Sequence, residues 1–217
     1  MLNYRSLKDI VYDYISEQIT SGKLKPNEAI NEATICRDLE ISRTPVREAL
    51  MQLSSEGYIE HVPRRGFFTR ELSLERVSNI YEILGNLEAL AAVKAMGRPE
   101  LLDLGEMRRL ASEMEQAIKA QQYESYHRLQ YRFHDVFVRA CGNEDLIRII
   151  VNLKKILMSH EYLKRLSVDD DPAVFDKINE EHWHIFNLFE ARDKEALRTF
   201  LSDEHWNVKY AEFHIFV

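Results

Sequence analysis

The sequence is poor in cysteine, glycine and proline, and this scarcity excludes several classes of protein. Its 217 residues include 2 Cys, 7 Gly and 5 Pro. Cys36 and Cys141 lie too far apart in the sequence to suggest a disulfide framework or a cysteine-based zinc site, which is typical of a reducing compartment. So few turn-forming residues argue against a sandwich or barrel of many strands. We therefore expect a mainly α-helical protein.

Long apolar runs are also missing. No run approaches the roughly 20 residues that a membrane-spanning helix needs, and residues 1–10 contain no apolar signal-peptide core. We therefore expect a cytoplasmic protein with no membrane partner. Lys and Arg number 29 against 36 Asp and Glu, which gives a net charge of −7. Such an acidic chain is not expected to bind polyanions in general, so any contact with nucleic acid must be local.

A local excess of positive charge does exist in residues 41–70. This stretch holds five arginines and three glutamates, a net charge of +2. Around it, apolar spacing predicts helices at about 7–21, 32–40 and 44–55, followed by two β-prone runs that flank a turn at 63–66. Helix, helix, tight turn, helix and hairpin is the order of a winged helix-turn-helix, which we assign to residues 1–72.

The positions of the arginines favour DNA over a protein partner for this domain. Arg43 and Arg47 are four residues apart and share one face of the third helix. Arg64 and Arg65 lie at the tip of the predicted hairpin. The start of the third helix and the tip of the wing are the two places where this architecture meets DNA. A small helical subdomain that binds protein is the alternative, and it leaves this placement unexplained.

Residues 73–217 show helical spacing throughout and no strand signal. The predicted helices lie at about 74–97, 100–121, 123–141, 143–165, 172–190 and 193–213. Breaks between them are marked by turn-forming residues such as Pro99 and Gly142. About 145 residues are enough for a core of their own. We therefore predict a second domain, an all-helical antiparallel bundle.

The central stretch Ile41–Leu50, with the sequence ISRTPVREAL, resembles the GntR family of bacterial winged-helix transcription regulators. The bundle resembles that family's FCD (FadR-type) effector-binding domain. Its marks are Phe133-His134, Gly142-Asn143, Glu181-His182 and Asp193 to Ala196. The resemblance implies a homodimer at the nucleoid, bound to a palindromic double-stranded DNA operator and controlled by a small acidic metabolite, often with a divalent metal.

Individual roles follow from the same resemblance. The positions that contact DNA in the family correspond to Arg43, Thr44, Arg47 and Gly66. We add Arg64 and Arg65 because of their place in the wing. The family's effector domain also carries a carboxylate-binding arginine early in its first helix. Leu84 stands there in this chain, so the carboxylate clamp is either lost or supplied by another cation such as Arg132 or Lys155.

The metal site of the family consists of one acid and three histidines. Gln130 stands at the position of the acid, and His134 and His182 match two of the histidines. Glu204 occupies the position of the third, with His205 one residue further. Helical spacing places Glu204 on the inner face of the last helix and His205 at its edge, 100° away. We therefore expect His134, His182 and Glu204 to converge, with Gln130 or His205 beside them.

This predicted cluster has two interpretations. Imidazole and carboxylate ligands suit Zn²⁺ or Ni²⁺ better than Mg²⁺. Without a metal, the same residues would form a hydrogen-bonded polar cluster in the core. A metal-dependent enzyme and a protein-interaction module are the rival functions. The sequence contains no His-Glu-x-x-His motif, because no histidine follows His160-Glu161 at that spacing, so we expect a regulator and not an enzyme.

Overall fold

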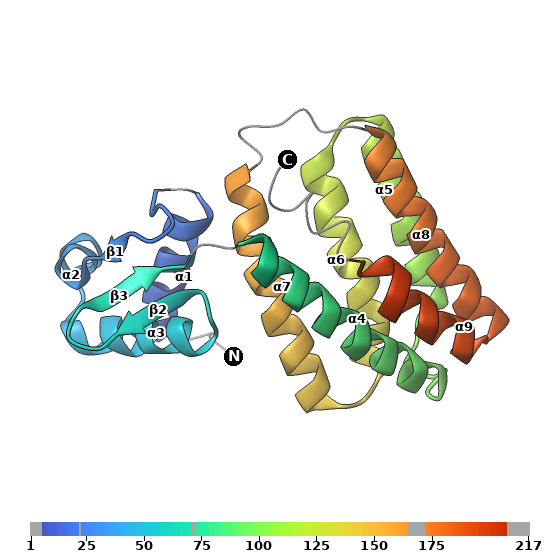
Figure 1. Ribbon diagram of the computed structural model, residues 1–217, viewed down its shortest axis with the longest axis horizontal. Coiled ribbons are helices and arrows are strands. Elements are labelled where there is room, and N and C mark those ends of the chain that lie inside the picture. The colour runs from blue at the N-terminus through green and yellow to red at the C-terminus, as the bar shows by residue number, and fades with distance from the viewer. Residues whose placement is uncertain (1–5, 22, 71–72, 165–171, 208–217) are drawn as a thin grey trace. The chain divides into compact units, whose positions relative to one another are not determined.

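The residues that the computed structural model describes are 6–21, 23–70, 73–164 and 172–207. Internal contacts divide the chain into two units, which are residues 1–73 with 154–167 and residues 74–153 with 168–217. Figure 1 shows a small sheet with helices α1, α2 and α3 in residues 1–73, and helices alone in the second unit. None of the described helices combines the length and apolarity that crossing a bilayer requires.

The first unit is a winged helix-turn-helix, as predicted. Its elements are α1 (Leu7–Thr20), β1 (Ala29–Ile30), α2 (Glu32–Leu39), α3 (Arg43–Ser55), β2 (Ile59–Val62) and β3 (Gly66–Thr69). The strands form an antiparallel sheet in the order β1-β3-β2. Strand β1 was not predicted, because a two-residue strand has no periodicity of its own and exists only through its pairing with β3.

Local signals in the sequence explain where these helices begin. Ser6 and Asp9 form a reciprocal capping box at the start of α1. The side chain of Asn31 accepts hydrogen bonds from the backbone N–H groups of Ala33 and Thr34, at 3.0 and 3.2 Å, and so starts α2. Apolar side chains of α1, α2, α3 and the sheet then pack into one core. This core holds the apolar face of α3, so the other face of that helix is exposed.

The second unit is all-helical. Its elements are α4 (Leu74–Met96), α5 (Leu104–Lys119), α6 (Tyr123–Ala140), α7 (Glu144–Lys164) as far as residue 153, α8 (Pro172–Ala191), α9 (Lys194–Thr199) and η1 (Phe200–His205). The rest of α7 is grouped with the first unit. Helix α5 packs between α6 and α8, while α4 packs against α6, α9 and η1 (Figure 1). The expected start of α5 near residue 100 was too early, because the Asp103 side chain caps the helix by accepting from the Glu106 N–H at 2.9 Å.

The last helix differs from its prediction in a way that affects the site. A continuous α-helix was expected over 193–213, but Phe200 to His205 form a π-helix, in which the turns are wider. Residues 208–213 lie outside the described residues. A π-turn inserts an extra residue into the helix, so the side chains that follow it are displaced around the helix axis.

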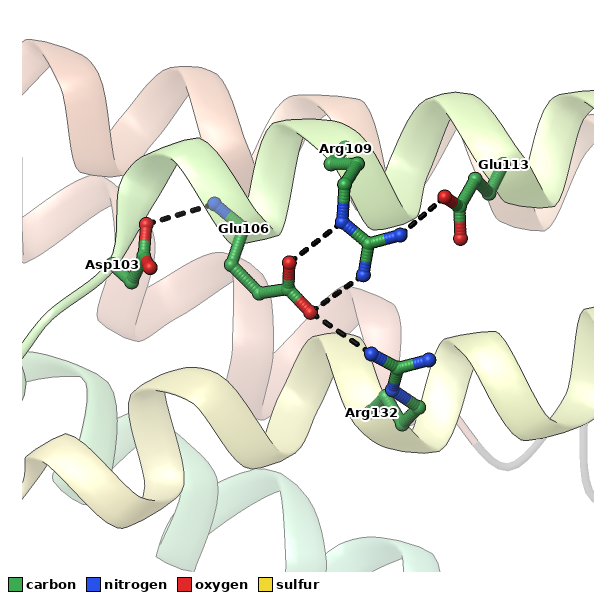
Figure 2. A network of polar contacts seen from close by, with 5 residues as sticks. All are labelled: Asp103, Glu106, Arg109, Glu113 and Arg132. Carbon is green, nitrogen blue, oxygen red and sulfur yellow. Dashed lines mark hydrogen bonds and ion pairs between the residues drawn. The ribbon is translucent and has the colours of Figure 1, made fainter.

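An ion-pair network ties α5 to α6 on the outside of the bundle (Figure 2). The Glu106 carboxylate accepts from Arg109 at 2.7 Å on its own helix and from Arg132 of α6 at 3.0 Å. Arg109 also contacts Glu113. The hydrogen bond from Arg109 is the largest of the effects that lower the pKa of Glu106. Such exposed networks contribute modestly to stability, and the Glu106–Arg132 pair is the part of this one that links α5 to α6.

Candidate nucleic-acid interface and metal centre

The first turn of α3 presents three of the predicted DNA-binding side chains. Arg43, Thr44 and Arg47 are exposed, whereas Val46 and Leu50 on the opposite face are fully buried. The N-cap residue of α3 makes no side-chain hydrogen bond to the helix. Arg47 Nε lies 3.5 Å from Oε2 of Glu32 in α2. This ion pair orients the guanidinium without burying it. This face can therefore offer cations and helix amides to a phosphate or a base edge.

The hairpin between β2 and β3 presents the wing residues. The backbone N–H of Arg65 donates to the Val62 carbonyl at 3.0 Å and closes the turn. Arg64 takes the left-handed conformation, with φ of 65°, which costs a non-glycine residue about 1 kcal/mol or more. Arg65 lies over the Phe68 ring, 5.2 Å from its centroid. Gly66 has φ of 95° and open space beside it, so both arginines extend from a tightly defined tip.

Three histidines meet in the core of the bundle. His134 of α6, His182 of α8 and His205 of η1 are 3%, 0% and 8% exposed. The Nε2 atom of His134 lies 3.3 Å from Nε2 of His182 and 3.1 Å from Nε2 of His205. Three buried imidazoles therefore direct ring nitrogens at one small volume.

Two carboxylates orient two of these rings by hydrogen bonds to Nδ1, the nitrogen that points away from the other histidines. Glu88 of α4 is fully buried, and its Oε2 accepts from Nδ1 of His134 at 2.6 Å. Glu181 of α8 accepts from Nδ1 of His205 at 2.9 Å. Because an ionised carboxylate only accepts hydrogen bonds, Nδ1 carries the hydrogen in both rings. The Nε2 lone pairs of His134 and His205 then face each other, which is unfavourable unless a cation or a proton lies between them.

The donor set fits a divalent metal ion. Nitrogen ligands of one Zn²⁺ lie about 2.0–2.1 Å from the ion and hence about 3–3.4 Å from each other. The two Nε2 separations around His134, 3.3 and 3.1 Å, fall in this range. Metal-binding histidines commonly donate their other N–H to a carboxylate, as His134 and His205 do here. The three histidines could therefore hold a metal ion.

The prediction that Glu204 belongs to this cluster is wrong. Glu204 is exposed and His205 is buried in its place. The physical reason is the π-helix, whose extra residue carries His205 round to the inner face. Gln130 lies one helical turn before His134 on α6 and is half-buried. The predicted His134 and His182 do come together, at the 3.3 Å separation of their Nε2 atoms.

Comparison with known families agrees with both halves of this description. Residues 7–69 match "Bacterial regulatory proteins, gntR family", and residues 79–206 match the FCD domain. The chain belongs to the GntR family, in the branch with an FCD domain. It is a transcription regulator that binds DNA, since this is the function of the family and of its N-terminal domain.

Individual relatives support this membership over most of the chain. It is 27% identical to the regulator YdhC of Bacillus subtilis over 86% of this chain and 82% of that protein. It is 26% identical to the gluconate operon transcriptional repressor of the same species over 82% of this chain and 73% of that protein. These relatives are regulators and not enzymes, and the GntR and FCD domains of this chain are likewise those of regulators.

Solved structures share the fold. Escherichia coli McbR/YncC superposes with a TM-score of 0.71 at 24% identity, covering 91% of this chain and 92% of that one. A GntR regulator from Rhodococcus sp. RHA1 gives a TM-score of 0.68 at 20% identity, covering 96% and 95%. The winged helix followed by a helical domain is thus an arrangement that solved proteins also have.

In this FCD domain, neither proposed substitute for the carboxylate-binding arginine has a suitable position. The Arg132 side chain is 58% exposed and is paired with Glu106 on the bundle surface (Figure 2). Lys155 is exposed as well, and Leu84 is fully buried. Arg132 and Lys155 therefore do not replace that arginine in the core, because both side chains lie on the outer faces of their helices. Loss of the carboxylate clamp is the alternative that remains.

Sequence reasoning also gave no role in the FCD site to three residues that shape it, although it named Glu181 as a mark of the FCD resemblance. They are Glu88, Glu181 and Trp206, the last of which donates from Nε1 to Glu88 Oε2 at 2.9 Å. A signal for Glu88 existed, because it follows Tyr81 and Leu84 on the apolar stripe of α4. A single acid on such a stripe needs a buried partner. Trp206 gave no comparable signal, since its burial depends on the π-helix before it.

Proposed function

We propose that this GntR-family chain is a ligand-responsive regulator that binds a palindromic operator as a homodimer in the cytoplasm, at the nucleoid. Residues 1–72 would read DNA, and residues 73–217 would bind the effector and the second subunit. The observation that carries the DNA-binding part is the exposure of five predicted contact residues on two adjoining elements. They are Arg43, Thr44, Arg47, Arg64 and Arg65.

Arg47 is the residue to test for base recognition. The operator is first selected from a random pool of DNA duplexes, and binding is then measured by fluorescence anisotropy. Arg47→Ala should weaken binding by about 1–3 kcal/mol and relax the preference at one base pair per half-site. Arg139→Ala removes an exposed arginine from α6 and is the matched control. Equal weakening on every sequence would mean that Arg47 touches only phosphate.

The homodimer follows from the size of a useful DNA target. One recognition helix contacts only a few base pairs, so a symmetric pair is needed to reach an adequate specificity ratio. Light scattering should give a mass of about 51 kDa, twice the 25.6 kDa of one chain. A mass of one chain at micromolar concentration would contradict the proposal.

In the bundle, we propose that His134, His182 and His205 hold a divalent metal, with Zn²⁺ or Ni²⁺ preferred to Mg²⁺. When bound, the metal supplies a Lewis-acidic centre for the oxygen atoms of a small acidic effector. Glu88 and Glu181 keep two of the imidazoles oriented, with Nδ1 carrying the hydrogen and Nε2 directed at the metal. Because Leu84 brings no charge to this core, the effector's carboxylate would depend on the metal for its recognition.

The metal is tested by elemental analysis of the purified protein and by melting with and without a chelator. The chelator should lower the melting temperature of the wild type, since a metal that binds only the folded state stabilises it. His182→Ala should abolish this shift. His184→Ala is the matched control, because His184 lies on the same helix and is exposed. The absence of both metal and shift in the wild type would leave the hydrogen-bonded cluster as the correct interpretation.

A further inference from the structure

The helix that carries His205 has a register that the α-helical spacing does not explain. In a continuous α-helix each residue advances by 100°, so Leu197, Leu201 and Glu204 would share one face. Leu197 and Leu201 are indeed fully buried. Glu204, however, is exposed, and His205 occupies the inner face that Glu204 would take. The six-residue π-helix between Phe200 and His205 is the only change in spacing between these positions in the described chain.

The neighbouring helix is adapted to the wide turn. Gly85 lies in the interior of α4, where glycine is unfavourable for an α-helix. A Cβ atom at this position would lie 3.1 Å from the carbonyl oxygens of both Leu201 and Ser202 and 3.2 Å from Cβ of Trp206. Two successive carbonyls of the π-helix therefore face the one residue that has no side chain to obstruct them.

Trp206, directly after the π-helix, holds this register. Its indole N–H donates to Glu88 at 2.9 Å. Its ring meets Tyr81 edge-on, with centroids 5.1 Å apart. If residues 200–206 returned to α-helical spacing, Trp206 would turn by about 100° and lose both partners. His205 on the inner face and Trp206 against α4 are thus features of a single state.

We infer that the π-helix η1 and Trp206 together determine which side chain of this segment faces the metal site. They place His205, in preference to Glu204, beside His134 and His182. This inference rests on the proposed metal site. The selected set has three imidazole nitrogens, which suit Zn²⁺, Co²⁺ or Ni²⁺. The alternative set, with Glu204, has two nitrogens and a carboxylate. It can still bind Zn²⁺, but its harder oxygen ligand narrows the preference for Zn²⁺ over Mn²⁺. The extra residue of the π-helix is therefore a determinant of metal specificity.

Two single-residue deletions distinguish the effect of the helical spacing from the effect of the ligand's identity. Deleting Ser202 or deleting His205 shortens the segment by one residue, so that an α-helix can reach Trp206 without a wide turn. The first deletion leaves His205 before Trp206, and the second leaves Glu204 there. Both variants are expected to unfold cooperatively near the wild-type melting temperature. The Ser202 deletion should keep the Zn²⁺ affinity of the wild type, whereas the His205 deletion should lower it relative to Mn²⁺ by about tenfold or more.

Deleting Glu180 is the control. Glu180 is an exposed residue of α8, which has no wide turn to absorb the loss, so His182 would be rotated out of the cluster. Circular dichroism melts in chelator compare the three deletions without metal. A Ser202 deletion that melts as low as the Glu180 deletion, or that folds but loses Zn²⁺, overturns the inference. A wild type without metal refutes the proposed site, while the melting comparison still decides the register.

Discussion

Replacing Glu88 by glutamine is predicted to weaken metal binding without destabilising the metal-free protein. Glu88 is fully buried and accepts from His134 Nδ1 at 2.6 Å and from Trp206 Nε1 at 2.9 Å. Glutamine has the same shape and keeps one acceptor oxygen, which the Trp206 N–H can use. Because both donors bond to the same oxygen of Glu88, this one acceptor can also serve the His134 N–H, so the change removes chiefly the negative charge.

The expected effects of Glu88→Gln differ between the metal-bound and the metal-free protein. Loss of the carboxylate behind a ligating histidine lowers metal affinity by about 10–100-fold, or roughly 1.4–2.7 kcal/mol. In the metal-free protein, if no proton takes the place of the metal, a buried carboxylate beside neutral histidines is costly. Its removal should therefore leave the free energy of unfolding unchanged, or raise it by about 1 kcal/mol. If an imidazolium replaced the metal, breaking its buried ion pair would instead cost about 3–5 kcal/mol.

The assay combines a Zn²⁺ titration against a competing chelator with thermal melts in excess chelator. Glu82→Gln is the matched control, because Glu82 lies on the same helix and is exposed. Wild-type Zn²⁺ affinity in Glu88→Gln would refute the role assigned to Glu88. A large drop in melting temperature in chelator would refute neutral histidines and favour a charged cluster.

Three further predictions concern stability and DNA binding. Arg64→Gly should relieve the left-handed backbone strain and raise stability by about 1 kcal/mol, yet lower the salt slope of DNA binding by about 0.9 for each phosphate that the arginine no longer neutralises. Burial raises the pKa of Tyr58 to about 12, so the stability that its neutral form contributes is complete below about pH 10 and is lost as the pH rises towards 12. Melts of Tyr58→Phe should lack that loss. The pKa of Glu106 is lowered chiefly by the hydrogen bond from Arg109. The stability that the ionised carboxylate adds is therefore present at a pH above the ordinary carboxyl pKa and is lost in acid. Melts of Glu106→Gln and wild type should converge there.

Each of these predictions has an outcome that contradicts it. An unchanged salt slope in Arg64→Gly would mean that this wing residue does not touch DNA. An alkaline transition of equal size in Tyr58→Phe would place its origin elsewhere, with Tyr12→Phe as the next variant, since burial raises the pKa of Tyr12 as well. A constant difference between Glu106→Gln and wild type across the acid range would show that the carboxylate's charge is not what stabilises the α5–α6 contact.

The winged helix could be predicted from the sequence because its signals are local. Asn31 caps α2, and Gly57, with φ of 85°, follows α3. Between them the apolar spacing of α3 determines which side chains face the core. The exposure of Arg43 and Arg47 follows from that spacing alone, as does the inward position of His134 and His182 on uninterrupted helices.

Tertiary structure decided what local signals do not encode. The two residues of β1 are a strand only because β3 pairs with them. Which of Glu204 and His205 faces the core depends on a π-helix that Gly85 accommodates and Trp206 anchors. Side chains keep to one face of a helix only while the number of residues per turn is constant. One extra residue therefore rotates every later side chain about the helix axis by about 100°. The family resemblance and helical periodicity together therefore predicted the cluster, and packing against α4 selected its third member.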